Sequence, residues 1–338
     1  MPSPRIHMGG DTAMPYRRPV DDMIPEERVA YLEEGQRWFN QWGGRGYPFD
    51  AGSVERAYEL LGMEQAVQLG AQMKAVGRND IWEPICDLAV EEARIIADEW
   101  EAEHDGQPYI SFADVMECIV YETMENEGMV HEPDGGYHYD LSWKVPNISI
   151  GFLCLGSRLY EEGDAEGALS WNLRAIKANP VAAPILLEVA ECHKLLDNID
   201  EGYEYACKAL DVAWRMVDVA KARRSLAFFE GERRNYSAAA ANLLLSHDYI
   251  PSAQAVQEFQ WLLSKGWDGQ MTLDEALEIA PEPNDDGIAV SETVMSSYSV
   301  ALIFADQVGD AALQQSVLEQ MLLANRNARK SLRPMTSQ

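Results

Sequence analysis

The fold is best predicted from residues 149–180, which read SIGFLCLGSRLYEEGDAEGALSWNLRAIKANP. Two stretches of helical period flank Gly163 and Asp164. At such a turn glycine can adopt a positive φ, and aspartate can cap the helix that follows. Pro180 ends the second stretch, since proline cannot continue a helix. These residues therefore predict a helical hairpin.

Small residues recur along the chain at a fixed spacing. Gly156, Ala168, Ala175 and Pro180 are twelve, seven and five residues apart. A second unit repeats this spacing at Ala190, Gly202, Ala209 and Trp214, and a third unit, offset by about three more residues, has Ala227, Ala239 and Pro251 at the matching positions. Small side chains are expected where the two helices of a hairpin cross closely, so the chain predicts three successive hairpins.

This spacing over residues 149–252 resembles that of the tetratricopeptide repeat (TPR) family, whose unit has roughly 34 residues. The resemblance implies an all-α, superhelical array of hairpins, because one hairpin cannot bury its apolar faces alone. It also implies that the first helix of each hairpin lines a concave groove for a partner segment. The groove positions carried over from the family are Leu153, Ser157, Tyr160, Leu187, Glu191, Lys194, Lys221, Arg224 and Phe228.

These positions predict an apolar groove with a basic end at Lys221 and Arg224. Such a groove suits an amphipathic or short apolar segment with an acidic flank. Family members that clamp acidic C-terminal tails use Lys and Asn at groove positions, and the first two units depart from that pattern, so this activity is not predicted. The alternative is that these residues pack between repeats, or that a helix of the same chain fills the groove.

The flanking regions give the rest of the organisation. Residues 1–20 and 327–338 are expected to be flexible tails, and 21–148 an acidic, mainly helical subdomain. Within it, 25–42 has helical period through Val29, Leu32, Trp38 and Phe39, and Asp80 with Glu83 predicts a capping box.

Two further regions complete this organisation. An Asp-Gly turn signal within 129–145 allows a small β-hairpin. Residues 253–326 predict a helical C-terminal cap, with a capping box at Thr272 and Glu275 and a degenerate repeat that turns at Gly309 and Asp310.

The charge balance limits the partners. The chain has 27 basic and 56 acidic side chains, a net charge of −29, and its acid is concentrated between Asp80 and Asp140, where 18 carboxylates accompany the single basic residue Arg94. Nucleic acid and anionic lipid both require basic side chains, so neither is an expected partner. The stretch 1–20 lacks a signal-peptide pattern, and the five cysteines form no CxxC pair, so we expect a cytoplasmic protein with reduced, buried thiols.

The sequence contains no phosphate-binding loop, dinucleotide fingerprint, HExxH, GxSxG or EF-hand loop, so no catalytic residue, metal or cofactor is predicted. The best metal candidates are His131, Glu132, His138 and Asp140, but they lie on either side of a predicted turn without a known ligand spacing, which favours exposed polar side chains.

The sequence favours a non-catalytic scaffold or adaptor that binds a protein or peptide. The alternatives are an enzyme with a site in the N-terminal subdomain, metal-dependent if these histidines bind zinc, or a regulatory sensor that responds to a peptide.

Overall fold

The computed structural model describes residues 54–55, 58–59, 61–75, 77–125, 146–284 and 287–328. Their regular structure is helical, apart from the isolated β-bridges that join Ile288 to Asn284 and Asn325, so the prediction of an all-α helical array is confirmed. Several predicted features lie outside the described residues. These are the N-terminal tail, the helix at 25–42, the β-hairpin within 129–145 and residues 329–338 of the C-terminal tail.

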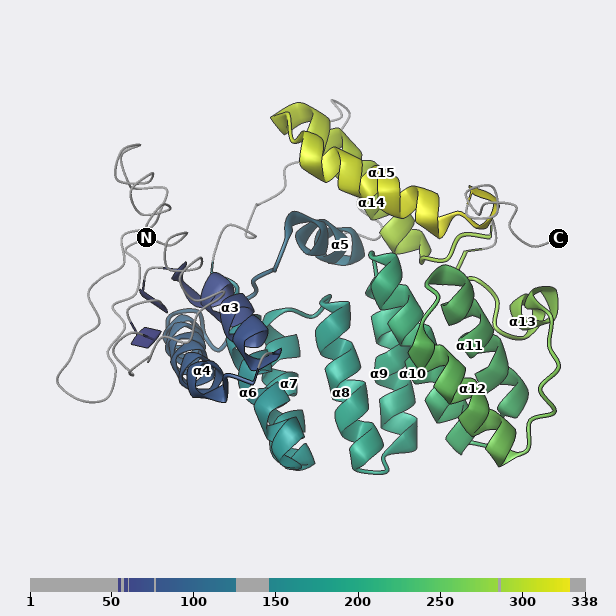
Figure 1. The fold of residues 1–338 in the computed structure, drawn as a ribbon. Coiled ribbons are helices and arrows are strands. Elements are labelled where there is room, and N and C mark those ends of the chain that lie inside the picture. The colour runs from purple at the N-terminus through teal and green to yellow at the C-terminus, as the bar shows by residue number, and fades with distance from the viewer. Residues whose placement is uncertain are drawn as a thin grey trace.

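Six consecutive helices form the centre of the molecule, and each packs against the next (Figure 1). They are α6 (Ser149–Glu162), α7 (Ala165–Ala178), α8 (Ala183–Leu195), α9 (Ile199–Val212), α10 (Met216–Glu232) and α11 (Tyr236–Tyr249). The pairs α6–α7, α8–α9 and α10–α11 are the three predicted hairpins.

The turns of these hairpins have the predicted chemistry. Gly163 ends α6 with a φ of 85°, and the side chain of Asp164 accepts a hydrogen bond of 2.9 Å from the backbone N–H of Gly167. The next two turns place Asp197 and Arg234 at positive φ, 59° and 65°, where glycine would be less strained. In all three hairpins the chain therefore reverses direction at a residue with a left-handed backbone conformation.

The described acidic helices pack on this array. The helices α3 (Met63–Ala75) and α4 (Asn79–Glu103) share one buried cluster with α6 and α7. Acidic side chains of α4 also pair with basic ones of the array. These ion pairs are Asp87–Arg158 at 2.7 Å, Asp98–Arg174 at 3.6 Å and Glu101–Lys177 at 2.6 Å.

The helix α5 (Val115–Glu125) belongs to a second buried cluster, with residues from the array and from the C-terminal helices. It packs against α14 (Glu292–Val308), and Ser297 Oγ donates a hydrogen bond of 3.1 Å to Thr123 Oγ1. The predicted C-terminal hairpin is confirmed, since α15 (Ala311–Ala324) follows a turn at Gly309 and is capped by Asp310. In Figure 1, α5 crosses above the array, beneath α14 and α15.

Two further helices extend the array beyond α11. The helix α12 (Ala253–Lys265) is capped by Ser252, and α13 (Leu273–Ile279) begins with the predicted capping box of Thr272 and Glu275. The capping box predicted at Asp80 is wrong. Helix α4 begins one residue earlier, and Asp80 instead accepts hydrogen bonds of 2.8 and 2.7 Å from the guanidinium of Arg78. The charge-assisted hydrogen bonds to Arg78 are stronger than a hydrogen bond from a backbone N–H, so Asp80 pairs with Arg78 and does not cap the helix.

Candidate functional site

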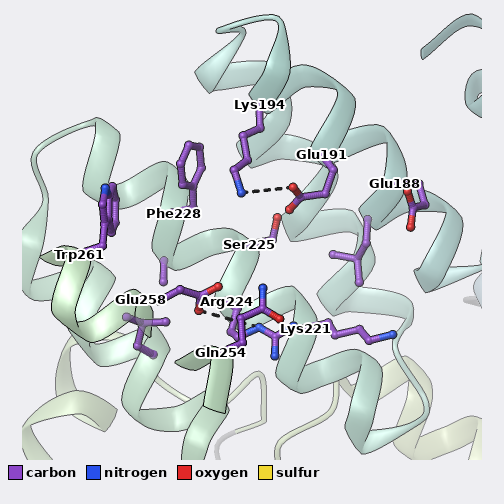
Figure 2. A pocket seen from close by; sticks show the side chains of 13 residues that line it. Glu188, Glu191, Lys194, Lys221, Arg224, Ser225, Phe228, Gln254, Glu258 and Trp261 are labelled. Carbon is purple, nitrogen blue, oxygen red and sulfur yellow. Dashed lines mark hydrogen bonds and ion pairs between the residues drawn. The ribbon is translucent and has the colours of Figure 1, made fainter. Parts of the chain in front are cut away.

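A pocket of about 380 Å³ lies between α8, α10 and α12 (Figure 2). Helix α8 contributes one wall, α10 the floor and α12 the opposite wall, with one residue from α11. The lining residues are Leu187, Glu188, Glu191, Lys194, Lys221, Arg224, Ser225, Ala227, Phe228, Leu243, Gln254, Glu258 and Trp261. Its volume falls in the range of sites that bind small ligands or single side chains.

Six of the nine predicted groove residues line this pocket. They are Leu187, Glu191, Lys194, Lys221, Arg224 and Phe228. The three residues predicted from the first unit, Leu153, Ser157 and Tyr160, lie half-buried on α6 and do not line it. The pocket therefore gathers the second and third predicted units, and the first is set apart from it.

The sequence analysis missed the contribution of α12. Gln254, Glu258 and Trp261 repeat the four-then-three spacing of Leu187, Glu191 and Lys194. That spacing places three side chains on one face of a helix. It also brings Ser225 into the pocket, because Ser225 follows Lys221 by four residues and precedes Phe228 by three. Extending the repeat past Pro251 would have found the three residues of α12.

The apolar end of the pocket is built around Phe228. Its ring stacks on that of Trp261, with the centroids 5.7 Å apart and the planes at 19°. The ammonium of Lys194 lies 4.2 Å from the centroid of the same ring and forms an ion pair of 3.2 Å with Glu191. Figure 2 shows Phe228 between Trp261 and Lys194. A cation over an aromatic ring is attractive, so this contact joins α8 to α10 as the ring stack joins α10 to α12.

The polar end contains donors that lack acceptors. Arg224 Nε lies 3.9 Å from Glu258 Oε2, too far for a hydrogen bond, and both atoms are buried without a hydrogen-bond partner in the described part of the chain. Ser225 is 7% exposed, and its Oγ is likewise without a partner among the described residues. Such atoms destabilise the protein unless something bonds to them.

Lys221 adds a free positive charge to this end. It is exposed, and no ion pair or hydrogen bond of its ammonium is found within the described ranges. Arg224 and Ser225 follow Lys221 by three and four residues, so both lie near Lys221 on one face of α10. That face therefore offers an ammonium, a guanidinium N–H and a hydroxyl to an incoming acceptor.

Two carboxyl groups of the pocket hold their protons more tightly than usual. Burial raises the pKa of Glu258, against the opposing effect of Arg224 and Lys194. Burial also raises the pKa of Glu188, where Glu191 adds to the increase and Lys221 opposes it.

The described residues show few other features of a metal site, a reactive cysteine or a membrane span. Among them no group of three His, Cys, Asp or Glu side chains is placed to hold a metal ion, and the histidine candidates at 131 and 138 lie outside the described ranges. Cys86, Cys118, Cys154 and Cys192 are buried, and burial raises the pKa of Cys192 to about 11, which disfavours the reactive thiolate. No helix in the described ranges has both the length and the apolar character to cross a membrane.

The fold and the site place this chain among helical-hairpin arrays that have a pocket between successive hairpins. In comparisons with known proteins, no protein-family model matches the chain, and no curated protein matches it significantly. The function must therefore be argued from the pocket.

Proposed function

We propose that this chain is a non-catalytic binding protein, a scaffold or adaptor of the tetratricopeptide class, that holds a segment of a protein partner between α8, α10 and α12. The observation that carries the proposal is the convergence of equivalent positions from these three helices on one pocket. The second and third repeats and α12 contribute the same face of a helix to it, which is how repeat arrays build an extended binding surface.

The two ends of the pocket define the chemistry of the segment. Leu187, Ala227 and Leu243 line the pocket together with the Phe228–Trp261 stack, so its apolar surface suits an aliphatic or aromatic side chain. The donors of Lys221, Arg224 and Ser225 favour an acidic side chain next to it. The pocket therefore suits an amphipathic segment with an acidic flank.

The test is selection from a random 16-residue peptide library displayed on phage, with the full chain as bait. We expect enriched peptides that pair an apolar side chain with Asp or Glu. Their affinity, measured by fluorescence anisotropy, should fall about 5- to 20-fold in Lys221→Glu, because an acid there repels the acidic flank. The matched control is Lys208→Glu, the same charge change at an exposed position on α9, outside the pocket. Equal losses in both variants, or no enrichment, would refute the proposal.

A further inference from the structure

One carboxylate of the pocket already lies where the acidic flank of a partner is expected to bind. Glu258 projects from α12 toward Arg224 on α10, and Figure 2 shows the two side chains facing each other. Arg224 also contacts the start of α12, since its Nη1 donates a hydrogen bond of 3.4 Å to Ser252 Oγ. The guanidinium that should receive the partner's acid is therefore next to a carboxylate of its own chain.

This internal ion pair is incomplete. Glu258 Oε2 and Arg224 Nε are 3.9 Å apart, so they attract each other without forming a hydrogen bond. The two side chains remain 30% and 18% exposed, respectively, and both line the pocket. A charge-assisted hydrogen bond between a guanidinium and a carboxylate at about 2.7–2.9 Å is stronger than such a separated pair. A partner carboxylate that forms one with Arg224 would therefore displace Glu258.

Burial already disfavours the ionised form of Glu258. It raises the pKa of this carboxyl and outweighs the neighbouring groups that favour ionisation. Those groups are Arg224 on α10, Lys194 on α8 and the amide of Gln254 on α12 itself. The carboxylate of Glu191 on α8 adds to the rise. Glu258 therefore accepts a proton at a higher pH than an exposed glutamate does.

An acidic partner moves this balance further. It takes Arg224 away from Glu258 and brings a second negative charge beside it, and both changes disfavour the ionised carboxylate. The pKa of Glu258 is then higher in the complex than in the free chain. Between these two pKa values Glu258 takes up a proton from solvent when the partner binds. Binding that takes up a proton becomes tighter as pH falls through that window.

We propose that Glu258 competes with the acidic flank of the partner for Arg224, and that the partner binds with uptake of a proton by Glu258. This inference rests on the proposed function, since it adds a specificity-determining residue to the same pocket. Glu258 lowers the affinity for acidic segments at high pH, and its protonation removes this competition as pH falls.

The experiment uses a phage-selected peptide that contains one Asp or Glu and no His, together with its Asn or Gln analogue. Both peptides carry a rhodamine label, and their anisotropy is titrated with the native chain and with Glu258→Gln. The matched control is Glu204→Gln, the same charge change at an exposed position on α9, outside the pocket. Titrations at about pH 5.5 and about pH 8 keep the acid of the peptide ionised throughout.

At the higher pH we expect Glu258→Gln to bind the acidic peptide about 5- to 20-fold more tightly than the native chain, because the competing charge is gone. The amide analogue and the Glu204→Gln control should each change by less than about 2-fold. The native chain should bind the acidic peptide about 5-fold more tightly at the lower pH, and Glu258→Gln should lose this pH dependence.

A double-mutant cycle tests whether Glu258 acts through Arg224. In the Arg224→Gln background, adding Glu258→Gln should improve the affinity by less than about 2-fold, because no guanidinium remains to be released. Circular dichroism checks that all variants have equal helicity. The pH dependence of the native chain, compared between the acidic peptide and its amide analogue, needs no variant and tests the inference even if a variant misfolds.

Three results would overturn the inference. They are equal affinity of the native chain and Glu258→Gln for the acidic peptide at the higher pH, a pH dependence that persists in Glu258→Gln, and one that is lost in Glu188→Gln instead. If the acidic peptide binds through Lys221 and Glu258→Gln does not improve its affinity, the proposed function stands and this inference fails. If neither the native chain nor Glu258→Gln enriches acidic peptides as bait, both proposals fail.

Discussion

The indole ring of Trp261 stacks on the ring of Phe228, and this contact joins α12 to α10 at the wall of the pocket. It also continues into α8, because Lys194 lies over the same phenyl ring. Three helices from successive repeats of the array are therefore linked through one aromatic side chain. This arrangement contributes to the position of α12, which also packs against α11, and so to the width of the pocket.

A methyl group at Gly231 should disturb this wall directly. A Cβ added there would overlap the six-membered ring of Trp261. We expect Gly231→Ala to displace the indole and to weaken phage-selected peptides about 3- to 10-fold, with less than about 1 kcal/mol lost in the free energy of unfolding, because α12 contributes few buried residues. Hydrogen exchange should rise in residues 253–265. Unchanged affinity would show that Trp261 is not part of the binding site.

A methyl group at Gly202 should instead destabilise the array. In an ordinary helix Gly→Ala is stabilising by about 0.5–1 kcal/mol. Here the added Cβ would overlap the ring of Phe229, which is fully buried between α9 and α10. We expect Gly202→Ala to lower the free energy of unfolding by about 1–3 kcal/mol, measured by urea denaturation. Glu204→Ala, at an exposed position on the same helix, is the control and should change stability by less than about 0.5 kcal/mol.

Glu117 should make stability fall as pH rises. Burial raises the pKa of Glu117 to about 7, with a smaller contribution from the nearby carboxyl of Asp114. Between pH 4.5 and 7 the folded chain therefore binds more protons than the unfolded chain, and the free energy of unfolding decreases with pH. Below this window the contribution is fully present, and above it the contribution is lost.

Replacing Glu117 with Gln removes this titration. The amide oxygen can still accept from the backbone N–H of Ala113 and the side chain of Asn179, which both donate to Oε2 at 2.8 Å. We expect Glu117→Gln to be more stable than the native chain at pH 8, by on the order of 1–3 kcal/mol, and similar at pH 5. Urea denaturation at both pH values checks this. Parallel pH curves for the two chains would contradict it.

The contact between α4 and α6 should depend on close packing more than on ion pairs. Asp87 is largely exposed where it pairs with Arg158, so Asp87→Asn should cost less than about 1 kcal/mol at low salt. Ala93 is fully buried where α6 approaches at Gly151, so Ala93→Leu should cost about 1–3 kcal/mol. Thermal unfolding of both variants at low and high salt compares the stability that the ion pair contributes with the stability that close packing contributes. A larger loss in Asp87→Asn would reverse this ranking.

The hairpins follow from the amino-acid sequence alone, because their signals are local. Gly163 and Asp164 specify a turn and a cap within a few residues, and Gly309 and Asp310 do so again near the C-terminus. The recurrence of small residues such as Ala168 and Ala175, both fully buried, then fixed where helices approach each other. Six residues of the pocket followed from the same register, because equivalent positions of a repeat face the same side.

Which of these helix faces meet depends on the folded chain. Leu153, Ser157 and Tyr160 share the register of the groove yet do not line the pocket, while Gln254, Glu258 and Trp261 complete it from α12. The same holds for α5, whose Thr123 meets Ser297 on α14 across 174 residues of sequence. Such contacts depend on how successive hairpins are rotated against each other, which is set by packing between distant side chains. Local propensity carries no information about that rotation, so the pocket required the folded chain.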